Sequence, residues 1–388
     1  MGVVRRRAIT TLLLGYTAFS MFRLSLGVAI PDIMVELSID ELKAGILYST
    51  PLWSTAALLT PAGYLGDRFE RKSILLLGYL LLGLGVMGLA LSSSYSNTLA
   101  FLLLAGAGGG ILVPTYYTLI GEALKNVRGF AIGLAASVYY IGGLIGSNLV
   151  GFFASLRSWR GAYLVIGLMI FCTLILQLVF LKRNVTADST EPRLHFFNLL
   201  KTRNIAVSAI GIFLGSVAMF AAAAWLPTFF ITVIRLDAAA AGMLLGLFFL
   251  ARAIGSITLG ALSDRFGRRT IIMLSGFAAA SITLPLLLTC YTLFVAAAYV
   301  ISYGFFASSF WSFFVTIPQE SVNRELVSSV TGLTQTFGLI GSAIGPIIAG
   351  ALITRFGLTL ALAFTMTSTT FILSLFSLAL IEKRPRRG

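Results

Sequence analysis

Long apolar segments of similar length alternate with short polar gaps along almost the whole chain. A helix of about 20 residues crosses a bilayer, so this pattern predicts a series of membrane-spanning helices. Twelve segments qualify, and their ranges are 8–34, 44–66, 73–92, 98–122, 129–154, 161–181, 205–233, 239–262, 270–290, 292–318, 328–353 and 358–381. The polar stretch from Lys182 to Asn204 separates the sixth from the seventh, and its "RLHFFNLLKTRN" predicts a short amphipathic helix at the membrane surface.

Composition agrees with an all-α, multi-pass membrane protein. Charged residues make up 11% of the 388-residue chain and hydrophobic residues 58%, whereas a soluble domain carries about 25% charged residues. The first apolar segment follows a basic "RRR" but continues to about residue 34. It is therefore too long for a signal peptide, and we interpret it as an uncleaved first helix.

The basic residues predict the orientation of the helices. With a cytoplasmic N-terminus, the outer loops hold only Lys43, Arg157, Arg160, Arg235 and Arg355, and most other basic residues fall inside. This distribution follows the positive-inside rule. It predicts that the chain lies in the cytoplasmic membrane with both termini in the cytoplasm. It also accounts for the net charge of +14 without nucleic-acid binding, since no basic reading face is present.

Reactive side chains are scarce. The single histidine, His195, lies in the polar stretch, and Cys172 and Cys290 lie in apolar runs without metal-ligand spacing. A metal site, a bound cofactor and an enzymatic nucleophile–base set are therefore not expected. No nucleotide-binding motif is present, so the chain is not a primary pump in its own right.

The chain repeats itself at about half its length. "GYLGDRFERK" at 63–72 returns as "GALSDRFGRR" at 260–269, and "GLIGS" occurs at 143–147 and again at 338–342. Glu122 and Glu320 close the fourth and tenth segments at nearly the same offset. We therefore predict an N-terminal six-helix half (1–181), a cytoplasmic linker (182–204) and a C-terminal six-helix half (205–388).

The repeated loop motif, with its helix count and linker position, resembles the signature of the major facilitator superfamily. The resemblance implies twelve helices in two pseudo-symmetric bundles, and transport of a small molecule by alternating access around a midplane site. The first copy departs from the pattern at Glu70, where the second copy has Gly267, so the local turn geometry is open there.

The resemblance also implies gating roles for charges at this end of the bundles. Asp67 and Asp264 would face helix N-termini, where a carboxylate is favoured, and Arg71 and Arg268 would reach Glu122 and Glu320. The gating set comprises Asp67, Arg68, Arg71, Glu122, Asp264, Arg265, Arg268 and Glu320. The alternative is that these charges only set the topology.

Two arginines interrupt the apolar segments. Arg23 lies about 24 Å along its helix from Arg7, and Arg252 about 18 Å from Asp264, so both sit deep in the hydrocarbon. An arginine there costs at least about 2.5 kcal/mol. We expect the pair to attract an anion, a carboxylate that each guanidinium holds bidentately. The alternative is that each arginine caps backbone carbonyls of an unwound helix.

Other candidate ligands share these helices or face the expected cavity. Tyr16, Ser20 and Arg23 form one stripe of the first helix. The remaining candidates offer hydroxyl, amide or indole groups, and they are Tyr139, Tyr140, Asn148, Trp225, Tyr303 and Gln335. "FRLSLGVAIPDIM" further resembles the first helix of the anion:cation symporter branch, which carries organic acids.

The sequence therefore predicts a monomeric secondary transporter of a small organic anion, coupled to protons or working by exchange. An exporter of a drug-like or other small solute is the alternative within transport, and a non-transporting membrane sensor is the alternative outside it.

Overall fold

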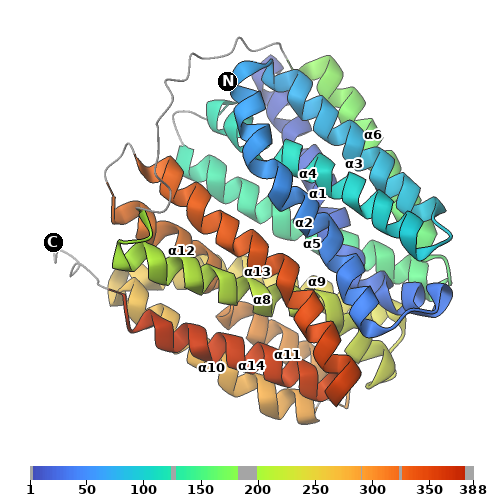
Figure 1. Ribbon diagram of the computed structural model, residues 1–388, viewed down its shortest axis with the longest axis vertical. Helices are drawn as coiled ribbons and strands as arrows, with labels where there is room; N and C mark the ends of the chain where they lie inside the picture. The colour runs from blue at the N-terminus through green and yellow to red at the C-terminus, as the bar shows by residue number, and fades with distance from the viewer. Residues whose placement is uncertain (1–2, 124–127, 182–198, 290, 323–325, 381–388) are drawn as a thin grey trace. The chain divides into compact units, whose positions relative to one another are not determined.

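A computed structural model describes residues 3–123, 128–181, 199–289, 291–322 and 326–380 (Figure 1). The side chains of some further residues inside helices lie outside this description, and among them are Asp67, Arg68, Glu122 and Asp264. His195 and the first half of the predicted amphipathic helix also lie outside the described residues. The described part of the chain consists of helices and short connections, as the sequence predicts.

The helices follow the predicted segments closely. The first half contains α1 (Val3–Leu37), α2 (Glu41–Arg68), α3 (Arg71–Leu91), α4 (Tyr95–Ala123), α5 (Arg128–Ser155) and α6 (Trp159–Phe180). The second half contains α8 (Arg203–Thr232), α9 (Ala238–Phe266), α10 (Arg268–Thr289), α11 (Leu293–Phe306), α12 (Ser309–Glu320), α13 (Val327–Phe356) and α14 (Leu358–Ser377). Eleven of the twelve predicted segments correspond to one helix each.

The tenth predicted segment is the exception, because it is broken into α11 and α12. The Ser308 hydroxyl donates to the Phe305 carbonyl at 2.6 Å, and the Ser308 N–H donates to the same oxygen at 3.3 Å. A serine that bonds a nearby carbonyl competes with the regular helical ladder. The interruption therefore arises locally, between Phe306 and Ser309.

Ten helices within the described residues are long and apolar enough to cross a membrane. Two predicted spans are not in that set, and the reason can be identified for each. Helix α2 carries Thr, Ser and Pro residues along its length, which lower its mean hydropathy, and α11 is shortened by the break before α12. The chain is a multi-pass, all-α membrane protein.

The chain divides into two compact units. Unit 1 comprises Met1–Ile39, Ile46–Glu191 and Asp237–Gly246, and unit 2 comprises Asp40–Gly45, Pro192–Leu236 and Leu247–Gly388. Each unit thus contains one half of the repeat and the first residues of one helix, α9 or α2, from the other half. The linker limits expected at 182 and 204 stay a prediction, since residues 182–198 lie outside the description.

The repeated "GLIGS" marks an equivalent helix contact in each unit. In unit 1, a Cβ on Gly146 of α5 would lie 2.5 Å from the Met21 carbonyl oxygen of α1. In unit 2, a Cβ on Gly341 of α13 would lie closer still to the Phe213 carbonyl oxygen of α8. Glycine lets membrane helices approach closely, so the sequence repeat encodes the packing of the fifth helix of each half on the first.

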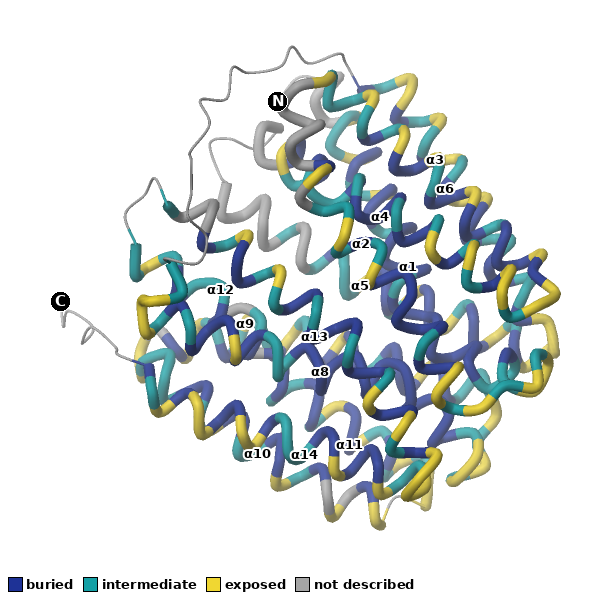
Figure 2. The backbone as a smooth tube through the Cα atoms, viewed as in Figure 1, coloured by how far each residue is buried: buried dark blue, intermediate teal, exposed yellow. Residues whose placement is uncertain are grey.

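Helix α8 shows how complete this packing is in unit 2. Every residue from Ser216 to Phe230 is buried (Figure 2), and α8 packs against α12, α13 and α14. A helix that is apolar on all sides and buried belongs to the core of its bundle. The equivalent helix of unit 1, α1, carries Arg23.

We predict that Gly146→Ala and Gly341→Ala each destabilise the protein, because the added methyl meets a backbone oxygen that cannot move aside. Overpacking of this kind costs about 1–3 kcal/mol. Gly332→Ala is the matched control, since a Cβ at Gly332 meets nothing within 4 Å. Alanine has a higher helix propensity than glycine, so this change should preserve or raise stability.

The measurement is the midpoint of thermal unfolding in detergent. Equal midpoints for all three variants would contradict the assignment of the repeated glycines to close helix contacts.

Candidate functional site

Arg23 of α1 is the charged centre of an aromatic cluster in unit 1. Its side chain is half-buried, and its guanidinium carbon lies 5.7 Å from the ring centroid of Phe19, one helical turn earlier. The guanidinium is hydrogen-bonded to the Tyr139 hydroxyl of α5. The hydroxyls of Tyr48 in α2 and Tyr117 in α4 lie within reach of its charge. Four helices of unit 1 therefore contribute to its surroundings.

Tyrosines extend this cluster along α1, α4 and α5. Tyr16 stacks on Tyr116 with ring centroids 4.1 Å apart and planes 5° apart, and its hydroxyl donates to that of Tyr117 at 3.4 Å. Tyr139 meets Tyr140 edge-on at 5.8 Å. Among the described residues, the buried hydroxyls of Tyr48 and Tyr116 have no hydrogen-bond partner. The cluster thus combines one cation, aromatic faces and hydroxyl groups.

Arg252 of α9 has a smaller aromatic environment in unit 2. Its side chain is 2% exposed, and its guanidinium carbon lies 5.6 Å from the ring centroid of Phe248, again one turn earlier. Phe248 stacks on Tyr303 of α11 at 6.3 Å, and the Tyr303 hydroxyl lies within reach of the Arg252 charge. That hydroxyl is buried and has no hydrogen-bond partner within the described part of the chain.

Both arginines therefore use the same local arrangement, Phe-x-x-x-Arg on one helix face. Residues i and i+4 of a helix are neighbours on its surface, and an aromatic face stabilises a desolvated cation by about 2 kcal/mol. Sequence reasoning missed Phe19 and Phe248, although this spacing is present in "FSMFR" and "FFLAR". It also missed Tyr48, which carries no local signal because α2 brings it to Arg23 only in the folded unit.

The structure places two other candidates in helix packing. The Ser20 hydroxyl donates to the Tyr16 carbonyl of its own helix, and Ser20 is fully buried against Gly142 of α5. Trp225 is 1% exposed, and its indole N–H donates to the Pro346 carbonyl at 3.0 Å. In this structure both side chains hold helices together, and a role in binding substrate stays a prediction for each.

The two amide candidates lie on the fifth helix of each half, Asn148 on α5 and Gln335 on α13. The Asn148 side chain donates to the Leu144 carbonyl of α5 at 2.8 Å, and a Cβ on Gly246 of α9 would meet its amide nitrogen at 2.6 Å. Gln335 lies half-buried on α13. Their proposed contact with substrate also stays a prediction.

The two copies of the loop motif differ in their turns. Gly267 adopts a φ of +87°, a conformation that glycine adopts readily. Glu70 at the equivalent position has φ −58° and ψ 116°, and its carboxylate accepts a hydrogen bond from Ser73 at 2.9 Å. The departure from the motif at Glu70 therefore changes the local backbone, and the Glu70 carboxylate bonds the first turn of α3 instead.

One ion pair of the expected gating set is present in unit 2. Arg268 at the start of α10 contacts Glu320 at the end of α12, with 2.6 Å between nitrogen and oxygen. Arg265 is exposed and Arg71 is half-buried, while the side chains of Asp67, Arg68, Glu122 and Asp264 lie outside the described residues. The gating function of the whole set stays a prediction.

Comparison with known proteins gives the family. A model described as Major Facilitator Superfamily matches residues 12–338 and 232–388. The helices, the repeated units and the repeated loop motif define a polytopic membrane transporter, and the chain belongs to the Major Facilitator Superfamily. Members of this family transport small molecules across membranes and are not enzymes.

Relatives cover most of the chain at low identity. An uncharacterized transporter of Bacillus subtilis (strain 168), YycB, is 28% identical over 338 residues, which are 84% of this chain and 82% of that protein. The 3-(3-hydroxy-phenyl)propionate transporter of Escherichia coli (strain K12) is 23% identical over 334 residues, again 84% and 82%.

Two shorter matches have names that indicate different cargoes. A probable sulfoacetate transporter of Cupriavidus necator is 29% identical over 151 residues, covering 37% of this chain and 34% of that protein. A multi-drug resistance efflux pump homolog of Lactococcus lactis is 25% identical over 144 residues, covering 37% and 36%. Both organic acids and drugs therefore occur among the named cargoes of relatives.

Solved structures share the fold. A bacterial homolog of the human lysosomal transporter Spinster, crystallised in an inward-facing conformation, superposes with a TM-score of 0.81 at 16% identity over 97% of this chain and 95% of that chain. The nucleoside transporter NupG gives a TM-score of 0.82 at 14% identity over 96% and 99%. These likenesses establish the architecture alone.

We predict a small stability effect from the pair Arg268–Glu320. The two side chains are 23% and 58% exposed, and exposed ion pairs contribute about 0–1 kcal/mol. Arg268→Gln and Glu320→Gln should therefore lower the thermal midpoint only slightly. The charge-reversed double variant, R268E with E320R, should recover most of that loss.

The control is Arg265→Gln, which removes an exposed charge from the same motif. If the double variant loses more stability than the two single variants lose together, the two charges do not interact favourably.

Proposed function

We propose that this transporter carries small organic carboxylates across the cytoplasmic membrane by alternating access, and that Arg23 holds the carboxylate. The observation that supports this most is the position of Arg23, a cation deep in an apolar helix with the hydroxyls of Tyr48, Tyr117 and Tyr139 within reach of its charge. Two named relatives carry organic acids, which agrees with the proposal.

The energetics favour an anionic cargo. A charged arginine at the middle of a membrane helix costs about 2.5–3.5 kcal/mol even on the lenient insertion scales. The contact with Phe19 and the bond to Tyr139 offset part of this cost. A bound carboxylate would offset more, because the planar guanidinium matches both oxygens of a carboxylate. A cationic drug would instead be repelled.

The tyrosines suit an organic rather than an inorganic anion. Their rings offer apolar faces, and their hydroxyls donate to or accept from polar substituents. Tyr48 and Tyr116 have buried hydroxyls without a hydrogen-bond partner among the described residues, and a buried hydroxyl gains when a partner is supplied. We assign Tyr139 the role of orienting the guanidinium, and Tyr16, Tyr117 and Tyr140 that of shaping its surroundings.

Arg252 has a supporting role in this proposal. It is a second embedded cation, in unit 2, and the Tyr303 hydroxyl lies within reach of its charge. Its 2% exposure makes direct contact with cargo less favourable than for the half-buried Arg23.

The distribution of basic residues supports cytoplasmic termini. In this proposal the coupling is through a proton carried with the substrate, or through anion exchange. We treat the transporter as a monomer.

The test is counterflow of labelled aromatic and aliphatic carboxylates into liposomes that contain the purified protein. Arg23→Ala should abolish uptake, and Arg23→Lys should retain the charge but weaken binding, since the ammonium cannot reproduce the guanidinium fork. Loss of a hydrogen bond to a charged group costs about 1.5–3 kcal/mol, or roughly 10–150-fold in affinity.

Arg235→Gln is the matched control, because Arg235 is an exposed arginine in the connection between α8 and α9. Transport of cationic dyes together with failure of every carboxylate would overturn the proposal in favour of a drug exporter. An absence of transport for both classes, with ligand binding retained, would favour a sensor.

A further inference from the structure

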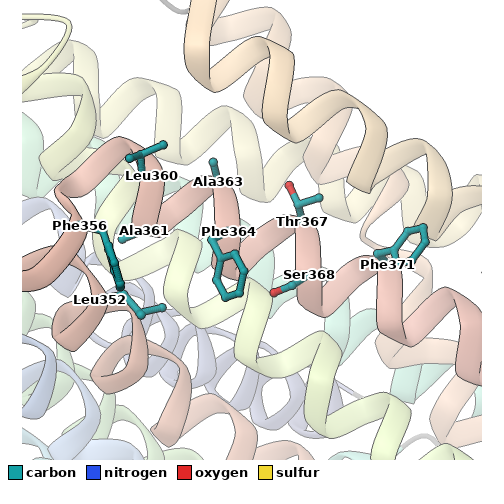
Figure 3. Close-up of a pocket in the computed structure, with 9 residues that line it drawn as sticks. All are labelled: Leu352, Phe356, Leu360, Ala361, Ala363, Phe364, Thr367, Ser368 and Phe371. Carbon is teal, nitrogen blue, oxygen red and sulfur yellow. The ribbon is translucent and has the colours of Figure 1, made fainter.

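A groove on the surface of unit 2 is separate from the arginine sites. It lies between the end of α13 and the outer face of α14 and has a volume of about 620 Å³ (Figure 3). Its lining includes Leu352, Phe356, Leu360, Phe364, Ser368 and Phe371. Along α14 the groove extends from Leu360 to Phe371, a rise of about 17 Å.

The lining is apolar, although it is open to the surroundings of the helix. Phe364 is 66% exposed and Leu360 is 56% exposed. The Ser368 hydroxyl lies within 3.5 Å of the Thr365 carbonyl of its own helix and so offers little to a ligand. A small organic anion would lose its hydration in this groove without gaining a polar partner. A hydrocarbon chain has no hydration to lose and gains close contact with the aromatic rings.

The length of the groove along α14 matches the thickness of one leaflet of the membrane. The hydrocarbon core of a bilayer is about 30 Å thick, so one leaflet provides about 15 Å. A groove that rises about 17 Å along a membrane helix therefore accommodates a lipid chain over the depth of one leaflet.

A positive charge lies at the end of the groove where α13 stops. Arg355 is exposed and directly precedes Phe356, which lines the groove. Gly357, with a φ of +80°, then turns the chain into α14. A basic side chain at the membrane surface attracts the phosphate of an anionic lipid. One residue along the chain from the lining residue Phe356, the protein therefore carries an exposed group that suits a phosphate.

We propose that this groove binds one acyl chain of an anionic phospholipid, whose phosphate is held by Arg355. This site does not depend on the nature of the transported substrate. It differs from the general lipid contact of a membrane protein in having a concave shape and a charged end.

The experiment uses native mass spectrometry of the full-length protein purified in detergent, titrated with phosphatidylglycerol or phosphatidylcholine. We expect phosphatidylglycerol to bind at least threefold more tightly than phosphatidylcholine. Arg355→Gln should remove this preference, while Phe364→Ala should weaken both lipids by at least threefold. Both residues are exposed, so the variants should fold, and unchanged thermal midpoints would confirm this.

The matched controls are Arg157→Gln, an exposed arginine in another connection, and Leu168→Ala, a leucine of α6 that is 55% exposed. Equal losses in Phe364→Ala and Leu168→Ala would overturn the site, because they would indicate only general lipid contact. A preference for phosphatidylglycerol that survives Arg355→Gln would overturn the role of the arginine. Displacement of the bound lipid by inorganic phosphate alone would overturn the role of the acyl chain.

Discussion

A positive charge inside hydrocarbon must be stabilised by the protein around it, and this requirement explains most of what surrounds Arg23 and Arg252. Each guanidinium lies near the ring of a phenylalanine one turn earlier on its own helix, and each lies near at least one tyrosine hydroxyl from a neighbouring helix. Aromatic rings and hydroxyls stabilise a cation without neutralising it.

These environments depend on how closely the helices approach. Tyr139 reaches Arg23 because α5 packs on α1, and the contact at Gly146 sets that distance. The equivalent glycine of the second half, Gly341, brings α13 against α8. The repeated glycines therefore build the frame in each unit, and the arginines occupy different helices of that frame, α1 in one unit and α9 in the other. Packing is repeated between the halves, whereas the two arginines inside the apolar helices are not at equivalent positions.

Much of the fold could be predicted from the sequence, because spans of apolar residues and a twice-repeated motif report directly on helix length and on internal symmetry. The break between α11 and α12 could not, since Ser308 competes for the Phe305 carbonyl without interrupting the apolar pattern. The site was only partly predictable. Arg23, Tyr16 and Tyr139 attract attention as polar groups in apolar helices, but the contribution of Tyr48 depends on how α2 packs. Ser20 and Trp225 show the converse difficulty. The sequence does not distinguish a polar side chain that donates to a backbone carbonyl from one that faces a substrate.

The most direct measurement compares an organic acid with its uncharged amide as ligands that shift the thermal midpoint of the purified protein. The pair differs mainly in charge, so the difference between their shifts reports on the positive field around Arg23. The account predicts that the acid stabilises the wild-type protein more than the amide does, and that this difference disappears in Arg23→Gln. Equal shifts from acid and amide in the wild type, or a preference for the acid that persists in Arg23→Gln, would contradict it.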